Sequence, residues 1–92
     1  MAGSNDGRLS GAELGQAALT TVQELTGYKP EAITGLEWDG EFWEVVVDVL
    51  ELSRIPNTTD VLASYVVQLD EQGTLRGLTR ARRFVRGQAE GG

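Results

Sequence analysis

The chain has 92 residues and a formal net charge of −6, and it contains neither cysteine nor histidine. This length suits one domain with a single core. The composition excludes disulfides, thiolate metal sites, the commonest general base and the serine–histidine type of catalysis. No apolar run is long enough to cross a bilayer and no secretion signal is visible, so we expect a cytoplasmic protein.

A helix is predicted to begin after Ser10, because Ser10 and Glu13 have the spacing of a capping box. Apolar residues then recur at three- and four-residue intervals over residues 14–25 and form one stripe. Gly27 suits the left-handed position that closes a helix, and Pro30 prevents the helix from continuing.

The remainder of the chain has the pattern of β-strands. Apolar and β-branched residues alternate in four segments, which are separated by turns at Asp39–Gly40, residues 56–60 and residues 71–73. The predicted strands cover residues 32–38, 41–55, 61–70 and 74–86. Tight turns imply an antiparallel meander, so the predicted fold class is α+β, with one N-terminal helix packed on a four-stranded antiparallel β-meander. The predicted boundaries are a disordered leader over residues 1–9, a single domain over residues 10–87 and a flexible tail over residues 88–92.

One helix can cover only one face of such a sheet, and we expect it to cover the face with the fewest charges. That face is predicted to comprise Trp43, Val45, Val47, Val49, Val61, Tyr65, Val67 and Leu69. The uncovered face should carry apolar residues among charged ones, with Glu44, Asp48, Arg80, Arg82 and Arg86 between them. An apolar surface rimmed by charge is typical of a protein–protein interface. A second copy of the chain or the N-terminal arm could also cover this face.

The charges are unevenly distributed along the chain. Of the 14 acidic residues 13 precede residue 74, whereas five arginines and no acidic residue lie between residues 74 and 87. The arginines can attract an anionic partner, or they can neutralise acidic side chains of the same sheet, and both interpretations stay open. The predicted partner-binding residues are Phe42, Val46, Leu50, Leu52, Leu62, Val66, Leu78, Arg80, Arg82, Arg83, Phe84 and Arg86.

No pattern in the sequence indicates catalysis, and we expect no enzyme activity, cofactor or metal. Glu44 and Asp48 lie four residues apart on one strand, where acidic residues usually serve solubility. The arginines that flank Phe84 are a minimal pattern for binding single-stranded nucleic acid by charge and stacking. The acidic body of the chain argues against that alternative.

Several blocks of the sequence resemble the gas vesicle protein O family. They are Glu24-Leu25-Thr26-Gly27, the Asp39-Gly40 turn with its tryptophan-rich strand, Arg54 to Tyr65, Leu69-Asp70 with Gly73 and Leu75, and Arg80 with Arg83, Phe84 and Arg86. The resemblance covers about residues 10–87. It implies a cytoplasmic, non-enzymatic accessory protein for gas vesicle assembly, associated with vesicles and in contact with other shell or accessory proteins.

The resemblance and the residue pattern together predict that the chain binds other gas vesicle proteins through its uncovered face and its arginine-rich last strand. The alternative is a regulator of gas vesicle gene expression that binds nucleic acid through the same arginines. A homodimer through the uncovered face is compatible with either function.

Overall fold

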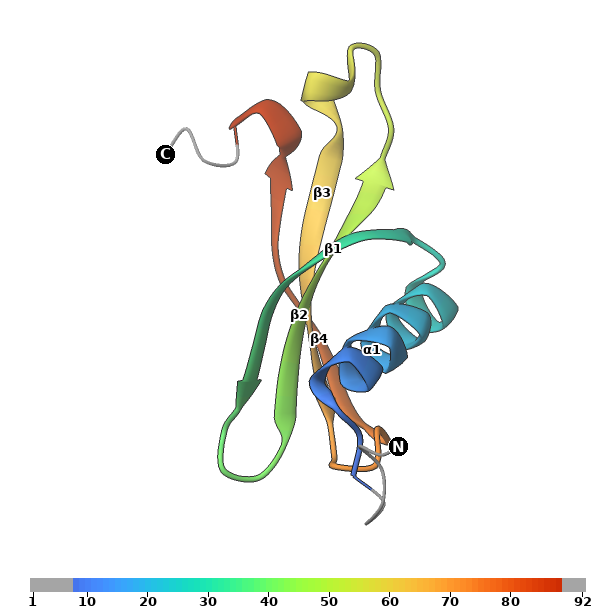
Figure 1. Ribbon diagram of the computed structural model, residues 1–92. Coiled ribbons are helices and arrows are strands. Elements are labelled where there is room, and N and C mark those ends of the chain that lie inside the picture. The colour runs from blue at the N-terminus through green and yellow to red at the C-terminus, as the bar shows by residue number, and fades with distance from the viewer. Residues whose placement is uncertain (1–7, 89–92) are drawn as a thin grey trace.

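The computed structural model describes residues 8–88 and confirms the predicted α+β fold, one helix with a four-stranded antiparallel sheet (Figure 1). The elements in chain order are α1 (Gly11–Thr26), β1 (Lys29–Trp38), β2 (Trp43–Leu52), the 3₁₀ turn η2 (Asn57–Thr59), β3 (Val61–Leu69), β4 (Leu75–Val85) and the 3₁₀ turn η3 (Arg86–Gln88). The strands pair in sequence order, so β1 and β4 are the edges of the sheet. The predicted disorder of residues 1–9 and 88–92 falls mainly outside the described residues and stays a prediction.

Helix α1 forms where the sequence predicts it. The Glu13 amide donates to Ser10 Oγ at 3.2 Å, and the Ser10 amide donates to Glu13 Oε1 at 2.8 Å, which completes the capping box. Gly27 ends the helix in the left-handed region with φ of 77°. Gly15 brings the helix close to the sheet, because a Cβ at this position would lie 2.9 Å from Ile33 Cδ1.

The core lies between α1 and one face of the sheet, which we call the helix-side face. Across β2 and β3, Val45 pairs with Val67 and Val49 with Ala63, and all four are inaccessible to solvent. The helix contributes its own fully buried residues, Leu14, Ala18 and Val22. Each buried valine or leucine side chain contributes roughly 1.5–3 kcal/mol. The predicted placement of Val45, Val47, Val49 and Val67 against the helix is therefore confirmed, whereas Val61 is only partly buried and lies outside this core.

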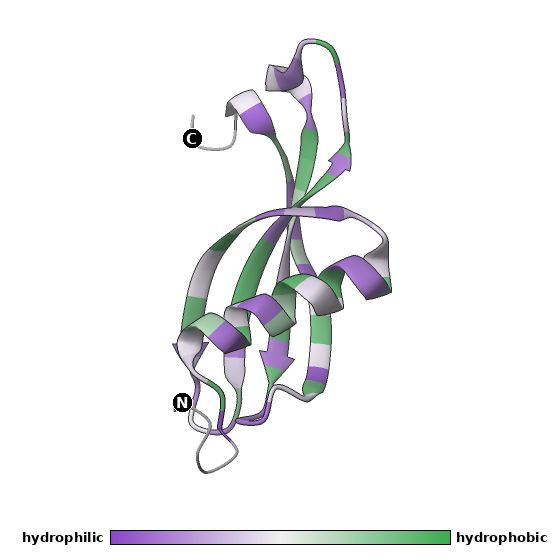
Figure 2. Cartoon of the chain, turned by 45° about the vertical axis from the view of Figure 1, so that its right-hand side comes forward, coloured by the Kyte–Doolittle hydropathy of each residue, from purple (hydrophilic) through white to green (hydrophobic). Residues whose placement is uncertain are grey.

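Helix α1 covers only part of the helix-side face. The ends of β2, β3 and β4 that carry η2 and η3 extend beyond the helix (Figures 1 and 2). The molecule is consequently elongated, with extents of 47 × 23 × 21 Å. We call the end formed by residues 52–60 and 85–87 the distal end, and the end formed by the two hairpin turns, residues 39–42 and 70–74, the proximal end.

Strand β1 is longer than the predicted segment 32–38, because it begins at Lys29 and includes Pro30. A proline is tolerated there since β1 is an edge strand and needs no hydrogen bond on its outer side. The register against β2 shifts at Glu31 and at Thr34, so β1 contains two bulges.

Strand β2 ends at Leu52, three residues before the predicted end, and its pairing with β3 contains a bulge at Glu51. The pairing of β3 with β4 contains two more, at Arg76 and Ala81. Each bulge adds one residue on one strand and so reverses the alternation of side chains beyond it. A strict alternation along β4 is therefore wrong.

Both hairpin turns at the proximal end are built around an aspartate. Asp39 Oδ1 accepts hydrogen bonds from the amides of Glu41 and Phe42, both at 2.8 Å, and Asp70 Oδ1 accepts from the amides of Gln72 and Thr74. The first loop has four residues, because Trp38 and Trp43 are the last pair of the ladder, and it is longer than the predicted tight turn. These interactions explain the turns without a bound cation.

The Asp39 turn predicts a dependence of stability on acid pH. Hydrogen bonds from the amides of Phe42 and Glu41 lower the pKa of Asp39 below its ordinary value of 3.8. A lowered folded-state pKa contributes stability above the unfolded-state pKa, and this contribution is lost as the pH falls through the folded-state value. We expect Asp39→Asn to flatten the fall in melting temperature below about pH 4, because the amide oxygen accepts the same bonds without titrating. Thermal melts of both proteins between neutral and acid pH test this, and parallel curves would contradict it.

Candidate functional site

The face opposite α1, the open face, carries alternating apolar and polar positions along β2 and β3. Its residues, from the strand register, are Lys29, Ala32, Gly35 and Glu37 of β1, Glu44, Val46, Asp48 and Leu50 of β2, Leu62, Ser64, Val66 and Gln68 of β3, and Gly77, Thr79, Arg82 and Phe84 of β4. Phe42, which precedes β2, and the bulge residue Arg76, which lies over its ring, extend this face toward the proximal end. The carboxylates of the central strands are satisfied within the face. Ser64 Oγ donates to Asp48 Oδ1 at 2.6 Å, and Gln68 Nε2 donates to Glu44 Oε2 at 3.2 Å.

Two arginines of the open face lie over aromatic rings. The guanidinium carbon of Arg82 is 4.5 Å from the centre of the Phe84 ring, and that of Arg76 is 5.8 Å from the centre of the Phe42 ring. Such cation–π contacts stabilise by roughly 0.5–1 kcal/mol at exposed sites. They also keep both cations close to aromatic rings of the open face.

The remaining arginines that were predicted to contact a partner are in ion pairs within the chain. Arg80 Nη1 lies 3.0 Å from Glu51 Oε2, and Arg83 Nε lies 2.9 Å from Glu51 Oε1. The Glu51 side chain is only 4% exposed. Burial, and next the charge of Glu51, raise the pKa of the neighbouring Tyr65. These two arginines therefore neutralise a buried carboxylate on the helix-side face.

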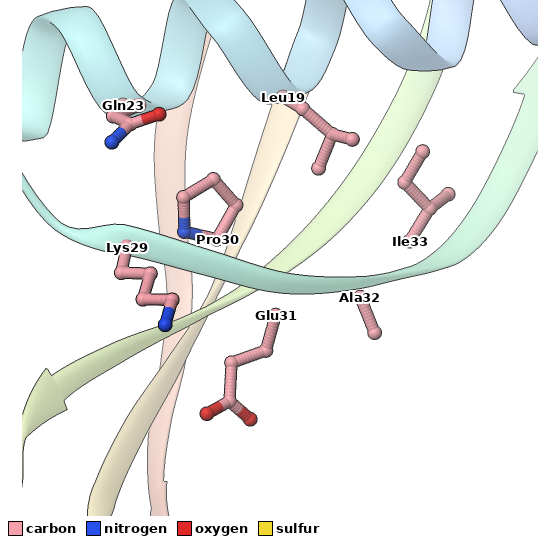
Figure 3. A pocket seen from close by; sticks show the side chains of 7 residues that line it. All are labelled: Leu19, Gln23, Lys29, Pro30, Glu31, Ala32 and Ile33. Carbon is pink, nitrogen blue, oxygen red and sulfur yellow. The ribbon is translucent and has the colours of Figure 1, made fainter.

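Arg86 joins the two edges of the sheet. Its guanidinium lies 2.7 Å from Glu31 Oε2 and 3.1 Å from Asp60 Oδ2. Hydrogen bonds to Glu31, and then those to Asp60, raise the pKa of Arg86. Glu31 points away from α1 (Figure 3), so this bridge lies on the open face at its distal end. Leu62, on the same face, is only 4% exposed.

Several placements predicted for the uncovered face are wrong for these reasons. Leu78 packs against the core from the helix-side face, opposite Val67. Arg80 alternates normally with Leu78 and lies on the same side, and the bulge at Ala81 reverses the alternation, so that Arg82 and Phe84 lie on the open face. The bulge at Glu51 puts Leu52 opposite Val61 on the helix-side face. Leu62 does lie on the open face, opposite Leu50 and Phe84, but it is only 4% exposed. Besides Leu62, the residues that the structure does bring together on the open face are Phe42, Val46, Leu50, Val66, Arg82 and Phe84.

The distal tip carries Ile55, which was not among the predicted partner-binding residues although it lies in the segment from Arg54 to Tyr65 that the sequence analysis names. Ile55 is 99% exposed. Hydrogen bonds within its loop hold the loop in place, so we call the loop braced. The Arg54 amide donates to Asp60 Oδ1 at 2.8 Å, and Thr59 donates to the Pro56 carbonyl through both its amide and its hydroxyl. The sequence signal that could have indicated an exposed apolar side chain was an isoleucine beside a proline in a polar loop. A projecting apolar side chain on a braced loop is a second candidate contact.

A shallow pocket of about 520 Å³ lies between α1 and β1. Leu19, Pro30 and Ile33 face it, whereas Glu31 and Ala32 point away from the helix (Figure 3). The lining also includes the polar residues Gln23, Lys29 and Glu31. Gln23 lies on α1 and Glu31 points away from it, so these groups do not converge as in a catalytic site (Figure 3). Within residues 8–88, no cluster of acidic side chains has the geometry to hold a metal ion, and no helix is long and apolar enough to span a membrane.

By fold and surface this is a small α+β protein, in which one helix covers part of a four-stranded sheet and a charged face is left open. The chain belongs to the gas vesicle synthesis protein GvpO family, whose family model matches residues 2–90. Sequence similarity to named proteins supports the same family assignment. The chain is 41% identical over 75 residues to gas vesicle protein O of a Streptomyces species, with 82% of this chain and 59% of that protein covered.

Two archaeal proteins are also similar. Gas vesicle protein O of Haloferax mediterranei is 32% identical over 71 residues, covering 76% of this chain and 51% of that protein. Gas vesicle protein O1 of Halobacterium salinarum is 31% identical over 70 residues, covering 76% of this chain and 59% of that protein. The chain thus spans between half and three fifths of the length of these relatives. No solved structure matches it significantly.

Proposed function

We propose that the chain is a non-enzymatic accessory protein of gas vesicle assembly that acts in the cytoplasm by binding another gas vesicle protein. Membership of the family over residues 2–90 is the observation that carries the gas vesicle role. The proposed contact surface is the part of the open face that the Arg86 bridge leaves accessible. It comprises Phe42, Val46, Val66, Arg76, Arg82 and Phe84.

Docking on the face is favoured over addition of a strand to an edge. Edge strand β1 contains Pro30 and bulges at Glu31 and Thr34, and β4 contains bulges at Arg76 and Ala81. Proline, bulges and charged residues are the features by which sheet edges resist pairing with another strand. The partner is therefore expected to present an apolar surface with carboxylates placed for Arg76 and Arg82.

Nucleic acid is not favoured as a ligand. Arg80, Arg83 and Arg86 already neutralise Glu51, Asp60 and Glu31, so little of the arginine charge is available for phosphates. The carboxylates of Glu44 and Asp48 also lie on the same face as Arg82.

The proposal predicts that charge changes on the open face abolish partner binding without unfolding the chain. A tagged chain is co-expressed with a complete set of gas vesicle proteins, and the captured proteins are identified. We expect Val46→Glu and Arg82→Glu each to reduce capture about tenfold or more, because one buries a charge in the contact and the other reverses a contact charge.

Thr20→Glu is the matched control, since it adds the same charge as Val46→Glu at an exposed position of α1. Arg82 is exposed, so Arg82→Glu is expected to leave the fold intact. This variant therefore tests the surface even if Val46→Glu lowers the stability of the chain. Normal capture by both open-face variants would contradict the proposed surface. Failure of the unmodified chain to capture any gas vesicle protein would contradict the proposed function.

A further inference from the structure

The two ends of the molecule differ in charge. The distal end and its surroundings contain Arg54, Arg80, Arg83 and Arg86 against Glu31, Glu51 and Asp60, and all three carboxylates are in ion pairs. The guanidinium of Arg54 has no hydrogen-bond or ion-pair partner among residues 8–88 and is exposed.

At the proximal end, by contrast, Glu37, Asp39 and Glu41 surround the β1–β2 turn, and within the described residues none of them is in an ion pair. Arg76 is an exposed cation beside this turn, with its guanidinium carbon 5.8 Å from the centre of the Phe42 ring. The three carboxylates outnumber it, so the turn is acidic, whereas the unpaired charge of Arg54 makes the distal tip basic.

Each end also exposes apolar side chains next to its charge. At the distal tip these are Ile55, which is 99% exposed, and Leu52, which is 44% exposed. At the proximal end they are Leu36 and Trp38, which are 39% and 44% exposed. The rings of Trp38 and Trp43 are in contact in a tilted arrangement, with their centres 5.5 Å apart, and together they form an aromatic surface. Exposed aliphatic and aromatic anchors on rigid elements are the usual centres of protein–protein contacts.

We propose that copies of this chain associate head to tail, with the distal tip of one copy docking on the proximal end of the next. Ile55 would pack on the patch of Leu36, Trp38 and Trp43, and Arg54 would meet the carboxylates of Glu37, Asp39 and Glu41. Opposite charge and apolar surface are matched in this orientation. Tip-to-tip or patch-to-patch contacts would bring like charges together.

The two surfaces lie at opposite ends of a molecule that is 47 Å long. A contact between two different surfaces of the same chain does not close on itself unless the rotation between copies happens to complete a ring. The association is therefore open-ended, and it leaves the open face of every copy accessible along the row. A contact centred on a loop tip is small, so we expect weak assembly that depends on protein and salt concentration.

Two half-blocked variants of the full chain test the arrangement by sedimentation velocity. Ile55→Asp blocks the tip and keeps the patch, whereas Trp38→Arg blocks the patch and keeps the tip. We expect the weight-average mass of the unmodified chain to rise continuously with concentration at low salt. Each variant alone should stay monomeric, with association weakened about tenfold or more, and their equimolar mixture should form a one-to-one dimer and nothing larger.

A second pair of variants avoids the risk that Trp38→Arg disturbs the Trp38–Trp43 packing. Glu37→Lys/Glu41→Lys changes only exposed carboxylates beside the patch, Glu37 on the open-face side of edge strand β1 and Glu41 in the turn, and Arg54→Glu reverses the tip charge. Each alone should abolish assembly. Mixing the two should restore open-ended assembly of alternating copies, because Arg54 of one variant meets the unchanged carboxylates of the other and the reversed pair of charges forms at the opposite end.

A chain that stays monomeric at all concentrations would overturn the proposal, as would a closed dimer of fixed mass, or assembly that survives Ile55→Asp. A mixture of half-blocked variants that fails to associate would overturn the head-to-tail orientation. The inference goes beyond the proposed function and does not depend on it. The purified chain is measured alone, so the result is independent of whether gas vesicle proteins are captured.

Discussion

Replacing Asp60 by alanine is expected to lower the free energy of unfolding by about 3 kcal/mol, because a buried carboxylate with several donors is removed. Asp60 is 4% exposed. It accepts the Arg54 amide on one oxygen and the Arg86 guanidinium on the other, and its own carbonyl accepts the Arg86 amide. One side chain thus connects the tip loop, the start of β3 and the end of β4. Urea unfolding of the purified variant measures the change.

Glu31→Ala is the matched control, because Glu31 binds the same guanidinium from a more exposed position, with 28% of its side chain accessible. We expect a loss below about 1 kcal/mol there, as for other exposed ion pairs. Equal losses for the two variants would show that the Arg54 amide and the burial of Asp60 contribute nothing. In that case the distal tip would not be braced as described.

The helix and the central strands could be predicted from the sequence because their determinants are local. The capping box of Ser10 and Glu13 and the glycine at position 27 define the ends of α1. In β2 the alternation of Val45, Val47 and Val49 identifies the buried face, and no bulge intervenes between them. The buried face of a strand can be predicted from the alternation of apolar residues where the strand is free of bulges.

The faces of β4 could not be predicted because they depend on bulges, and a bulge is set by the pairing of two strands. Ala81 has no sequence signal that marks it as the extra residue, yet it decides that Arg82 and Phe84 lie on the open face although Leu78 and Arg80 lie on the helix-side face. Arg86 in turn contacts Glu31, 55 residues away in the chain. Long-range contacts of this kind are not visible in the spacing of residues.

The same bulges divide the arginines into two groups with different roles. Arg80, Arg83 and Arg86 neutralise carboxylates within the chain, so they stabilise the distal part of the sheet. Arg76 and Arg82 lie over aromatic rings of the open face. The structure thus shows the neutralising interpretation for the first group, and attraction of an anionic partner stays a prediction for the second.

This division predicts strongly non-additive effects at the Glu51 site. Arg80→Met and Arg83→Met should each cost less than about 1 kcal/mol, because the other arginine still neutralises Glu51, whose side chain is 4% exposed. Together they should cost about 3 kcal/mol, since the buried charge is then uncompensated. Methionine keeps the apolar stem of arginine over Glu51 and prevents water from simply replacing the lost partners. Urea unfolding of the two single variants and the double variant measures the coupling.

Adding Glu51→Gln to the double variant separates the charge from the packing. If the cost of the double variant comes from an unpaired buried carboxylate, the neutral amide should recover most of it, whereas in the unmodified chain the same substitution should destabilise by removing both ion pairs. Additive losses for the two methionine variants, or no recovery with glutamine, would mean that Glu51 is not the reason why Arg80 and Arg83 face the helix side. The two arginines would then return to the set of candidate partner contacts, and the contact surface would extend from the open face to the distal end.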